Sequence, residues 1–274
     1  MTLQHNHTEM KIARIWEQCE GIRTFELDGE VNAKAGQFIM LYDPESTENP
    51  FTVSYDKPLR IMVKSRGEDD GENSFTNRLF GMREGDRLQI TGPLGNGYAD
   101  LMGKGEPIYI VMGGCGTAGL PLLEKELGVK GVRRHYIIGA RNVDSIPDDV
   151  FKIESDMTFT TEDGSFGVGG TVIDGLPLHD IMIENNRNDA HAIICGPRKM
   201  LIEAGKEVSG VMWPDHIIVS LEPYMKCGRG VCGSCEVDGY HACTDGPNFR
   251  YSDLMDAPDF RDYRRGKSGA LERL

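Results

Sequence analysis

The pattern of apolar and polar positions along the chain changes at about residue 100. Before this point, short apolar segments recur every 10 to 25 residues, with Gly, Pro and Asp between them. This spacing is typical of a small antiparallel barrel. Barrel strands are predicted at 12–16, 24–27, 37–42, 51–55, 61–64 and 87–90. A helix is predicted at 75–80, capped by Ser74, and a closing turn at 92–95.

After about residue 105, short continuous apolar segments alternate with helix-like ones. Such strands, set between helices, indicate a parallel sheet covered on both faces. The strands are predicted at 108–112, 136–138, 157–159 and 192–195, and the helices include 120–127 and 199–204. A last strand at 217–221 leads into a Cys-rich segment, and the polar residues 244–274 are predicted to form a partly ordered tail.

Length and charge narrow the class of protein. The 274 residues suggest about two domains. Acidic side chains number 43 against 30 Lys and Arg, for a formal net charge of −13. This balance disfavours nucleic acid as a partner, because phosphate contacts need Lys and Arg. No apolar run approaches the roughly 18 residues of a spanning helix, and the first residues lack a signal-peptide pattern. We therefore expect a cytoplasmic protein without a membrane span.

The strongest chemical signal is a cluster of four of the seven cysteines, with the spacing C-x4-C-x2-C-x7-C. Thiolates at nearly this spacing hold plant-type [2Fe–2S] clusters, and the intervening glycines let the loop aim backbone N–H groups at sulfur. A structural zinc site is the alternative, but zinc sites usually show two separated pairs. A third alternative, that the four cysteines are unrelated buried thiols, is disfavoured because a Gly-rich loop has little core in which to bury them. The predicted metal ligands are Cys227, Cys232, Cys235 and Cys243, and the glycines are Gly228, Gly230 and Gly233.

A second signal is a G-x-G-x-x-G loop that follows the predicted strand at 108–112 and precedes a helix. In this context bare backbone and a helix N-terminus can face the phosphates of a dinucleotide; the alternative is a tight strand–helix turn. The acidic residue that usually hydrogen-bonds the ribose, about 20 residues later, is absent. Arg141 stands there instead, and it either reaches a 2′-phosphate or is only a surface charge. This is therefore not an ordinary Rossmann dehydrogenase. The loop residues are Gly114, Gly116, Thr117 and Gly119.

A third signal is the tripeptide Cys195, Gly196 and Pro197, which closes the fourth strand of the predicted sheet. Ligands of open α/β sheets bind beyond the carboxyl ends of the strands. We therefore expect this turn to lie beside the Gly-rich loop, although it could serve only to end the strand.

Taken together, these features resemble the ferredoxin reductase superfamily. More narrowly, they resemble the iron–sulfur electron-transfer subunits of heterodimeric dihydroorotate dehydrogenases. The resemblance covers about residues 10–250, includes the N-P-F-T-V-S stretch at 49–54, and is most specific in the cysteine segment at 225–247. It implies a β-barrel plus α/β fold: an antiparallel FAD-binding barrel (8–102), an NAD(P)-binding domain with a parallel sheet (103–215), a C-terminal [2Fe–2S] segment (216–250) and a tail (251–274).

The resemblance also implies which residues bind FAD. The family motif R-P-x-S falls on 49–52, so the Arg that pairs with the FAD phosphate in relatives is Asn here. Lys64 or Arg66 can supply charge-assisted donors in its place. The stretch 161–167 resembles a nucleotide-domain motif, T-D-D-G-S-x-G, and is also simply a good turn. The implied flavin residues are Asn49, Pro50, Phe51, Thr52, Val53, Ser54, Met62, Val63, Lys64, Gly71, Asn73 and Ser74.

The function implied is electron transfer. NADH delivers two electrons as a hydride, a [2Fe–2S] cluster accepts one at a time, and a flavin between them can do both. Nothing in the chain offers a site for oxidising dihydroorotate, so that reaction of pyrimidine biosynthesis is expected in an FMN-containing catalytic subunit, within a heterotetramer. Arg229 and Val231 are the expected partner contacts, unless Arg229 is solvated and Val231 packs inward.

Two other classes of function remain open. One is an NAD(P)H-dependent reductase subunit serving ferredoxin, sulfite reductase or sulfhydrogenase, because related subunits share most of these features. The other is a zinc-stapled binding protein without enzymatic activity.

Overall fold

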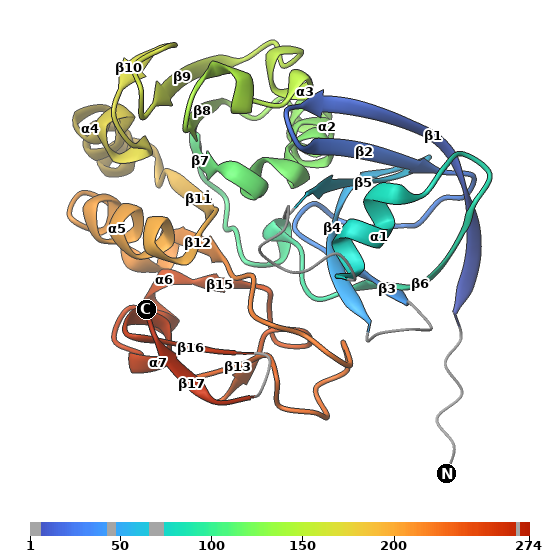
Figure 1. Ribbon diagram of the computed structural model, residues 1–274. Helices are drawn as coiled ribbons and strands as arrows, with labels where there is room; N and C mark the ends of the chain where they lie inside the picture. Colours follow the sequence, from blue (N-terminus) through green and yellow to red (C-terminus); the bar gives the residue numbers. More distant parts are fainter. Residues whose placement is uncertain (1–6, 43–47, 66–73, 267–268) are drawn as a thin grey trace.

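The structure is a computed structural model that describes residues 7–42, 48–65, 74–266 and 269–274. Gly71, Asn73 and Arg66, which were considered above for the flavin, lie outside the described residues. In Figure 1 the barrel lies on the right and the α/β sheet on the left, with the C-terminal part of the chain below the sheet. No helix in the described ranges is long and apolar enough to cross a membrane.

The first half of the chain forms a closed antiparallel barrel, as predicted. Its strand order is β1-β2-β5-β4-β3-β6, and pairing of β6 with β1 closes it. Apolar side chains on alternate positions fill the interior, including Phe25, Ile39 and Ile61, which are fully buried. The strands are β1 (Thr8–Cys19), β2 (Ile22–Leu27), β3 (Phe38–Tyr42), β4 (Asn49–Asp56), β5 (Leu59–Lys64) and β6 (Arg87–Leu94).

Two local predictions for the barrel have different outcomes. The helix α1 (Phe75–Gly81) begins where expected, and the Ser74 side chain accepts a hydrogen bond from the backbone N of Asn77 at 3.3 Å. The predicted turn at 92–95 is wrong, because β6 continues to Leu94 and pairs with Phe38. Gly92 has a φ of +141°, and the register shifts beside it. The glycine thus marks a bulge inside a strand rather than the end of one.

The second half forms a mostly parallel sheet, also as predicted, in the order β10-β9-β8-β7-β11-β12-β15. Alternate strand residues face two cores: Ile110 and Ile138 pack with the leucines of α2, whereas Val111 and Ile194 pack with the apolar face of α5, which includes Leu201. Only β15 runs antiparallel to its neighbour. The strands are β7 (Ile108–Gly113), β8 (Arg134–Ala140), β9 (Asp156–Thr161), β10 (Val168–Gly169), β11 (His191–Cys195), β12 (Ile217–Ser220) and β15 (Asn248–Arg250).

The helices of this half include two that the apolar pattern did not predict, α3 and α4. The bounds are α2 (Leu120–Lys130), α3 (Asp148–Phe151), α4 (Leu178–Asn188) and α5 (Arg198–Ser209). Short 3-10 turns are η1 (Tyr98–Asp100), η2 (Gly114–Gly119), η3 (Val143–Ser145), η4 (Val172–Gly175) and η5 (Pro214–His216).

The C-terminal part differs most from expectation. Because β12 and β15 belong to one sheet, the boundary expected at 216 falls inside that sheet, and the cysteine segment is a long connection between two strands. The tail prediction is wrong: Leu254 and Phe260 are fully buried, and Arg198 donates hydrogen bonds to the carbonyls of Asp259 and Phe260. The elements here are β13 (Glu236–Val237), β14 (Tyr240–His241), α6 (Tyr251–Leu254), α7 (Pro258–Arg261), β16 (Tyr263–Arg265) and β17 (Leu271–Arg273).

Polar contacts of α2 hold the sheet against the barrel. Lys125 Nζ lies 2.6 Å from Asp56 Oδ1 at the end of β4, and the backbone N of Ala35 donates to Glu126 Oε1 at 2.8 Å. The helix that follows the Gly-rich loop is therefore docked on the barrel, which brings the loop to the boundary between the two halves.

Candidate functional site

The Gly-rich loop and the predicted flavin stretch meet at this boundary. A Cβ added to Gly119 would lie 3.2 Å from Cγ2 of Thr52 on β4. Beside it, the ring of Phe51 lies 5.8 Å from the ring of Phe75, the first residue of α1. The structure therefore places the stretch at 49–54, the capped helix start and the Gly-rich loop next to one another.

Burial separates the predicted flavin residues into two groups. Asn49, Pro50, Phe51 and Thr52 are half-buried, as a binding surface requires, but Val53 and Ser54 are buried. On β5, Met62 and Lys64 face outward and Val63 faces the core, as strand alternation dictates. The side chains of Val53 and Val63 are therefore barrel core, and only their backbone is left for a cofactor.

The Gly-rich loop lies against the C-G-P turn, as the argument from strand ends predicts. A Cβ on Gly116 would lie 2.5 Å from the carbonyl carbon of Cys195 and 2.9 Å from the N of Gly196. Thr117 Oγ1 donates to the carbonyl of Gly114 at 2.8 Å and closes the loop. Only glycine fits at position 116, so bare backbone faces the space beyond the strands, where a dinucleotide can approach closely.

Cys195 is part of a buried polar group that no sequence pattern indicated. Burial, and then the charge of Glu222, raise the pKa of the Cys195 thiol to about 12. Burial likewise raises the pKa of Tyr98, whose hydroxyl interacts with Ser220 and with Cys195. Ser220 pairs with Cys195 in the strand register. These residues come from three separate segments, and their burial keeps the thiol neutral at physiological pH.

The 161–167 segment forms a tight turn at the same edge of the sheet. Asp163 Oδ1 accepts a hydrogen bond from Ser165 N at 2.9 Å, and hydrogen bonds from Ser165 lower the pKa of Asp163. The backbone N of Asp163 donates to the carbonyl of the exposed Arg141 at 3.2 Å. The turn is thus ordered by its own hydrogen bonds, next to the end of β8.

The cysteine loop curls so that backbone N–H groups reach sulfur. Gly230 N donates to Cys243 Sγ at 3.1 Å, and Arg229 N donates to Cys227 Sγ at 3.4 Å. The three loop glycines have φ values of +63°, +71° and +70°, conformations that side chains rarely adopt. Consecutive amides in such a loop form a concavity of the kind that holds iron–sulfur clusters.

The four thiols lie in two pairs. Cys235 Sγ is 3.3 Å from Cys243 Sγ, and burial together with this contact raises the pKa of Cys243 to about 12. Burial alone would raise the pKa of Cys232, but hydrogen bonds with Ser234 and Cys227 lower it to about 6. Within the described ranges no three ligating groups are already gathered around one metal position. The all-thiol donor set and the amides aimed at sulfur nevertheless fit an iron–sulfur cluster.

The loop rests on the barrel. A Cβ on Gly228 would lie 2.9 Å from Met40 Cγ and 3.0 Å from Leu94 Cδ1, on β3 and β6. Arg229 Nη2 lies 3.5 Å from Glu48 Oε1, immediately before β4, and the two side chains are 28% and 8% exposed. Arg229 is therefore not merely solvated, its contact with a partner stays a prediction, and Val231, at 73% exposed, does not pack inward.

A pair of asparagines joins the end of the cysteine segment to the residues that follow the last barrel strand, β6. Asn248, fully buried on β15, donates from its side chain to the carbonyls of Asn96 at 2.8 Å and Gly36 at 3.2 Å. Asn96 in turn donates to the carbonyl of Asn248 at 2.9 Å. This reciprocal pair joins segments 152 residues apart, which is why no local pattern predicted it.

The fold and the site together define the class as FAD- and NAD-binding oxidoreductases of the ferredoxin reductase type. A chain from the structure of an NADH-dependent reduced ferredoxin-NADP oxidoreductase aligns with a TM-score of 0.68 and 26% identity, over 94% of this chain and 95% of that one. The FAD/NAD-binding domain of nitric oxide dioxygenase from Vibrio cholerae shares the fold, with a TM-score of 0.66 and 14% identity over 80% of this chain and 99% of that one.

Sequence relatives are more specific. Residues 222–255 match the iron–sulfur cluster binding domain of dihydroorotate dehydrogenase B. The chain is 36% identical to the "Probable dihydroorotate dehydrogenase B (NAD(+)), electron transfer subunit" of Pyrococcus furiosus, over 97% of this chain and 98% of the relative. Its counterpart in Methanothermobacter thermautotrophicus is 34% identical, over 95% of each. The chain belongs to the family of dihydroorotate dehydrogenase B electron transfer subunits.

Proposed function

We propose that this chain moves electrons between NAD and the flavin of a catalytic partner that oxidises dihydroorotate to orotate. The observation that carries the proposal is the contact of three predicted sites on one barrel. Thr52 touches the dinucleotide loop at Gly119, and Met40 and Leu94 support the cysteine loop at Gly228. Electron carriers held by these segments would be neighbours.

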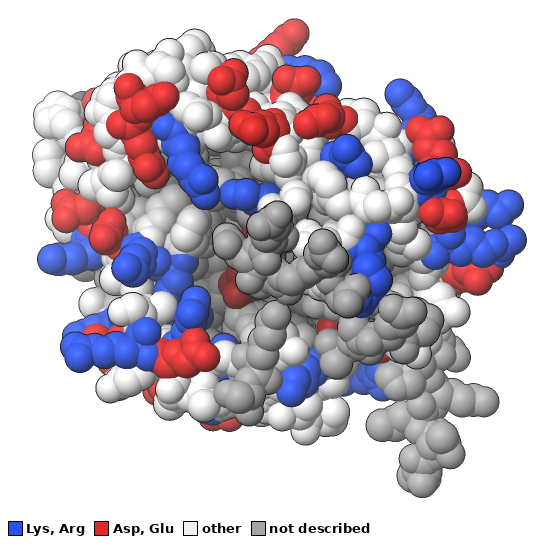
Figure 2. All heavy atoms as spheres, in the orientation of Figure 1, with Lys and Arg blue, Asp and Glu red and all other residues white. Residues whose placement is uncertain are grey.

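Each cofactor would supply a different part of the chemistry: when bound, NAD exchanges a hydride, FAD divides electron pairs, and a [2Fe–2S] cluster passes single electrons. The chain itself binds and orients. We assign the FAD surface to the half-buried residues at 49–52 with the outward Met62 and Lys64, and the dinucleotide to the loop at 114–119 with 195–197. In Figure 2, Lys and Arg side chains lie both near the centre of the face and along its left and right edges, and acidic ones gather along its upper part. The cations near the centre suit anionic cofactors at the boundary of barrel and sheet.

Cys195 would keep the reaction centre neutral. Its thiol is buried and its pKa is raised to about 12, so it carries no charge that would compete for the nicotinamide. The Tyr98 hydroxyl and Ser220 fix its position through their contacts. Their role in this proposal is to position the thiol and exclude water.

The exit for electrons would be the exposed tip of the cysteine loop, where Val231 and Cys232 face solvent. We infer a catalytic subunit containing FMN as the partner there, in a heterotetramer, because a one-electron centre must lie close to its acceptor. We place the complex in the cytoplasm, since the three cysteines outside the cysteine loop, Cys19, Cys115 and Cys195, form no disulfide in the described residues, as in a reducing compartment.

A second candidate function is reduction of ferredoxin, favoured by the 26% identity and nearly complete overlap with the ferredoxin-NADP oxidoreductase chain. Co-purification with a dihydroorotate dehydrogenase catalytic subunit, followed by assay of dihydroorotate-dependent NAD⁺ reduction, separates the two. Complex formation with that activity supports the first function. NADH-dependent ferredoxin reduction by the free chain, without complex formation, supports the second.

A further inference from the structure

The C-terminal segment, residues 251–265, packs along helix α5 and contacts it at two points. At the start of α5, Nη1 of Arg198 donates hydrogen bonds to the carbonyls of Asp259 at 3.4 Å and Phe260 at 3.3 Å. The guanidinium also lies 5.3 Å from the centre of the Phe260 ring. A charged donor makes such hydrogen bonds stronger than neutral ones, so this contact ties the first turn of α5 to the C-terminal segment.

The second contact lies seven residues further along α5, at Gly205. A Cβ at this position would lie 2.4 Å from Cε2 of Tyr251, so only glycine lets the tyrosine ring lie directly on the helix. The Tyr251 ring in turn lies 6.2 Å from the Phe260 ring, edge to face, and Phe260 is fully buried. One aromatic pair therefore serves both contacts, which fixes α5 to the C-terminal segment along most of its length.

Met200, in the first turn of α5, contacts both loops of the dinucleotide edge. A Cβ added to Gly113, the last residue of β7, would lie 2.6 Å from Met200 Sδ, and a Cβ added to Gly196 would lie 2.6 Å from Met200 Cε. The Gly-rich loop starts at the first of these glycines, and the second lies in the turn at 195–197. Because closely packed interiors transmit displacement, a shift of α5 would move this turn relative to the Gly-rich loop.

Arg198 is an unusual residue for a contact that serves packing alone. Burial lowers its pKa to about 10, and the charge of Asp259 offsets only part of this effect. The oxygens that accept its hydrogen bonds belong to carbonyls rather than carboxylates. Burying a guanidinium without an anionic partner costs free energy, which an apolar side chain would avoid. What the guanidinium adds is direction, since its planar group fixes the angle at which two segments meet.

The C-terminal segment is also fixed at its far end. Arg265 Nη2 lies 3.6 Å from Glu236 Oε2, and Arg265 Nε donates to the carbonyl of Glu236 at 3.3 Å. Glu236 directly follows Cys235, one of the predicted cluster ligands. The C-terminal segment therefore reaches from the cysteine segment to the helix that carries the dinucleotide turn.

We propose that Arg198 is a positioning residue, through which the C-terminal segment holds the 195–197 turn where a bound dinucleotide needs it. The inference rests on the proposed function in assigning this turn to the dinucleotide. Without the guanidinium contact, the turn would take several positions relative to the Gly-rich loop, and only some of them would bind NADH productively. A misplacement of about 1 Å can slow a reaction about 100-fold, so Arg198 affects binding and rate without touching the dinucleotide.

Three measurements on the full chain with its cofactors, as wild type, Arg198→Met and Arg198→Lys, test the proposal. Hydrogen–deuterium exchange of the backbone amides at 195–201, without NAD, should be faster in Arg198→Met, because the turn opens more often. Isothermal titration should show NAD⁺ bound about tenfold more weakly, and stopped-flow reduction of the flavin at saturating NADH should be about tenfold slower. Arg198→Lys keeps the charge but not the planar group, so its values should fall between the other two.

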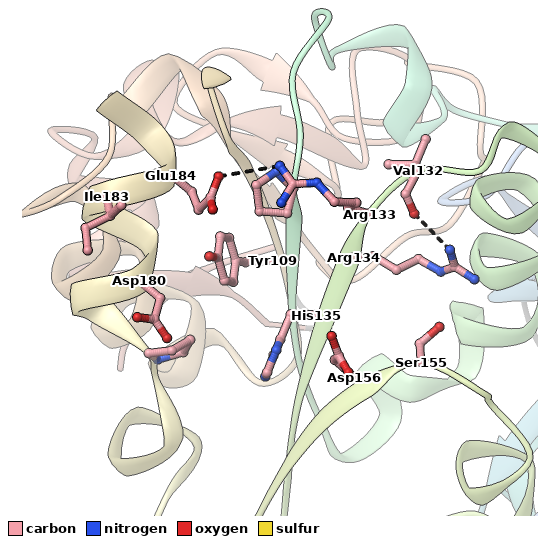
Figure 3. Close-up of a pocket in the computed structure, with 12 residues that line it drawn as sticks. Tyr109, Val132, Arg133, Arg134, His135, Ser155, Asp156, Asp180, Ile183 and Glu184 are labelled. Atoms are coloured by element: carbon pink, nitrogen blue, oxygen red, sulfur yellow. Dashed lines mark hydrogen bonds and ion pairs between the residues drawn. The ribbon is translucent and has the colours of Figure 1, made fainter. Parts of the chain in front are cut away.

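The matched control is Arg133→Met, at the opposite edge of the same sheet. Arg133 lies 3.4 Å from Glu184 on α4, and a dashed line in Figure 3 marks this contact in a cavity of about 530 Å³. Helices α4 and α5 cover one face of the sheet, since Ile181 and Leu201 belong to the same core. The control thus breaks an arginine contact to a helix on this face but leaves the dinucleotide edge intact. All three measurements should give wild-type values.

A merely structural role for Arg198 predicts a different result. It would lower the thermal midpoint and the yield of flavin-loaded protein, but the NAD⁺ affinity and the rate constant of the folded molecules would stay at wild-type values. Wild-type values in Arg198→Met would therefore overturn the proposal. If that variant does not fold, Arg198→Lys decides: weaker binding and slower reduction support the proposal, and wild-type values overturn it. Reduction of the wild-type flavin by NADH tests the proposed function separately, because it does not depend on either variant.

Discussion

Replacing Arg229 by Met should loosen the cysteine loop from the barrel. The change removes the cation 3.5 Å from Glu48 Oε1 and leaves a carboxylate whose side chain is only 8% exposed. Breaking a buried ion pair in this way costs about 3–5 kcal/mol, whereas an exposed pair contributes about 0.2–1 kcal/mol. Arg229 is 28% exposed, so we expect an intermediate cost of about 2 kcal/mol.

This cost should appear as faster loss of the cluster. If iron leaves through local opening of the loop, about 2 kcal/mol corresponds to roughly 30-fold faster release. The rate is measured from the decay of visible absorbance after adding an iron chelator anaerobically. Glu48→Gln should have a smaller effect, because it removes the buried charge together with the pairing. The double variant should fall short of the sum of the single effects.

The matched control is Arg264→Met, which breaks the Arg264–Glu272 pair, 64% and 48% exposed. This variant should release iron at nearly the wild-type rate. Equal rates in Arg229→Met and Arg264→Met, or strictly additive effects of Arg229→Met and Glu48→Gln, would refute the reasoning that the pair anchors the loop.

Two further predictions concern the other cofactors. Gly116→Ala forces a Cβ to within 2.5 Å of the Cys195 carbonyl carbon, so NADH oxidation with a dye acceptor should fall about 100-fold while bound FAD and iron are retained. The control is Gly128→Ala on α2, where no atom lies within 3.5 Å of the added Cβ, and this variant should keep wild-type activity. An active Gly116→Ala enzyme would disprove the close approach. If Lys64 replaces the missing arginine, Lys64→Met should weaken FAD binding about tenfold in flavin-release titrations. Lys57→Met, which changes an exposed lysine at the β4–β5 turn, should leave FAD binding unchanged. Equal affinities of the two variants for FAD would assign the phosphate contact to other groups.

Much of the fold was accessible from the sequence because its signals are local. Apolar period and turn residues predict both the barrel and the sheet, and the meeting of Gly116 with Cys195 follows from the rule that strand ends share an edge. The C-terminal elements give no apolar period, because the buried Tyr251 and Phe260 stand singly among polar residues and Leu254 has one apolar neighbour, Met255.

The contacts that assemble the site had no such signal. The Asn96–Asn248 pair, the Arg229–Glu48 ion pair and the group around Tyr98 each join distant segments. Single-sequence periodicity carries no information on which distant residues meet, so only the three-dimensional structure reveals these contacts. By contrast, the burial of Val63 is a local feature, because strand alternation places it on the same face as Ile61.

Electrons are expected to reach the partner through the cysteine loop, and replacing Cys232 by Ser tests this route. Cys232 is the exposed member of the four cysteines, so its replacement removes one cluster ligand with little disturbance of the core. In complex with the catalytic subunit, the variant should retain FAD and NADH-to-dye activity but lose the cluster's visible absorption and dihydroorotate-dependent NAD⁺ reduction. Wild-type NAD⁺ reduction in a variant shown to lack the cluster would rule out this route.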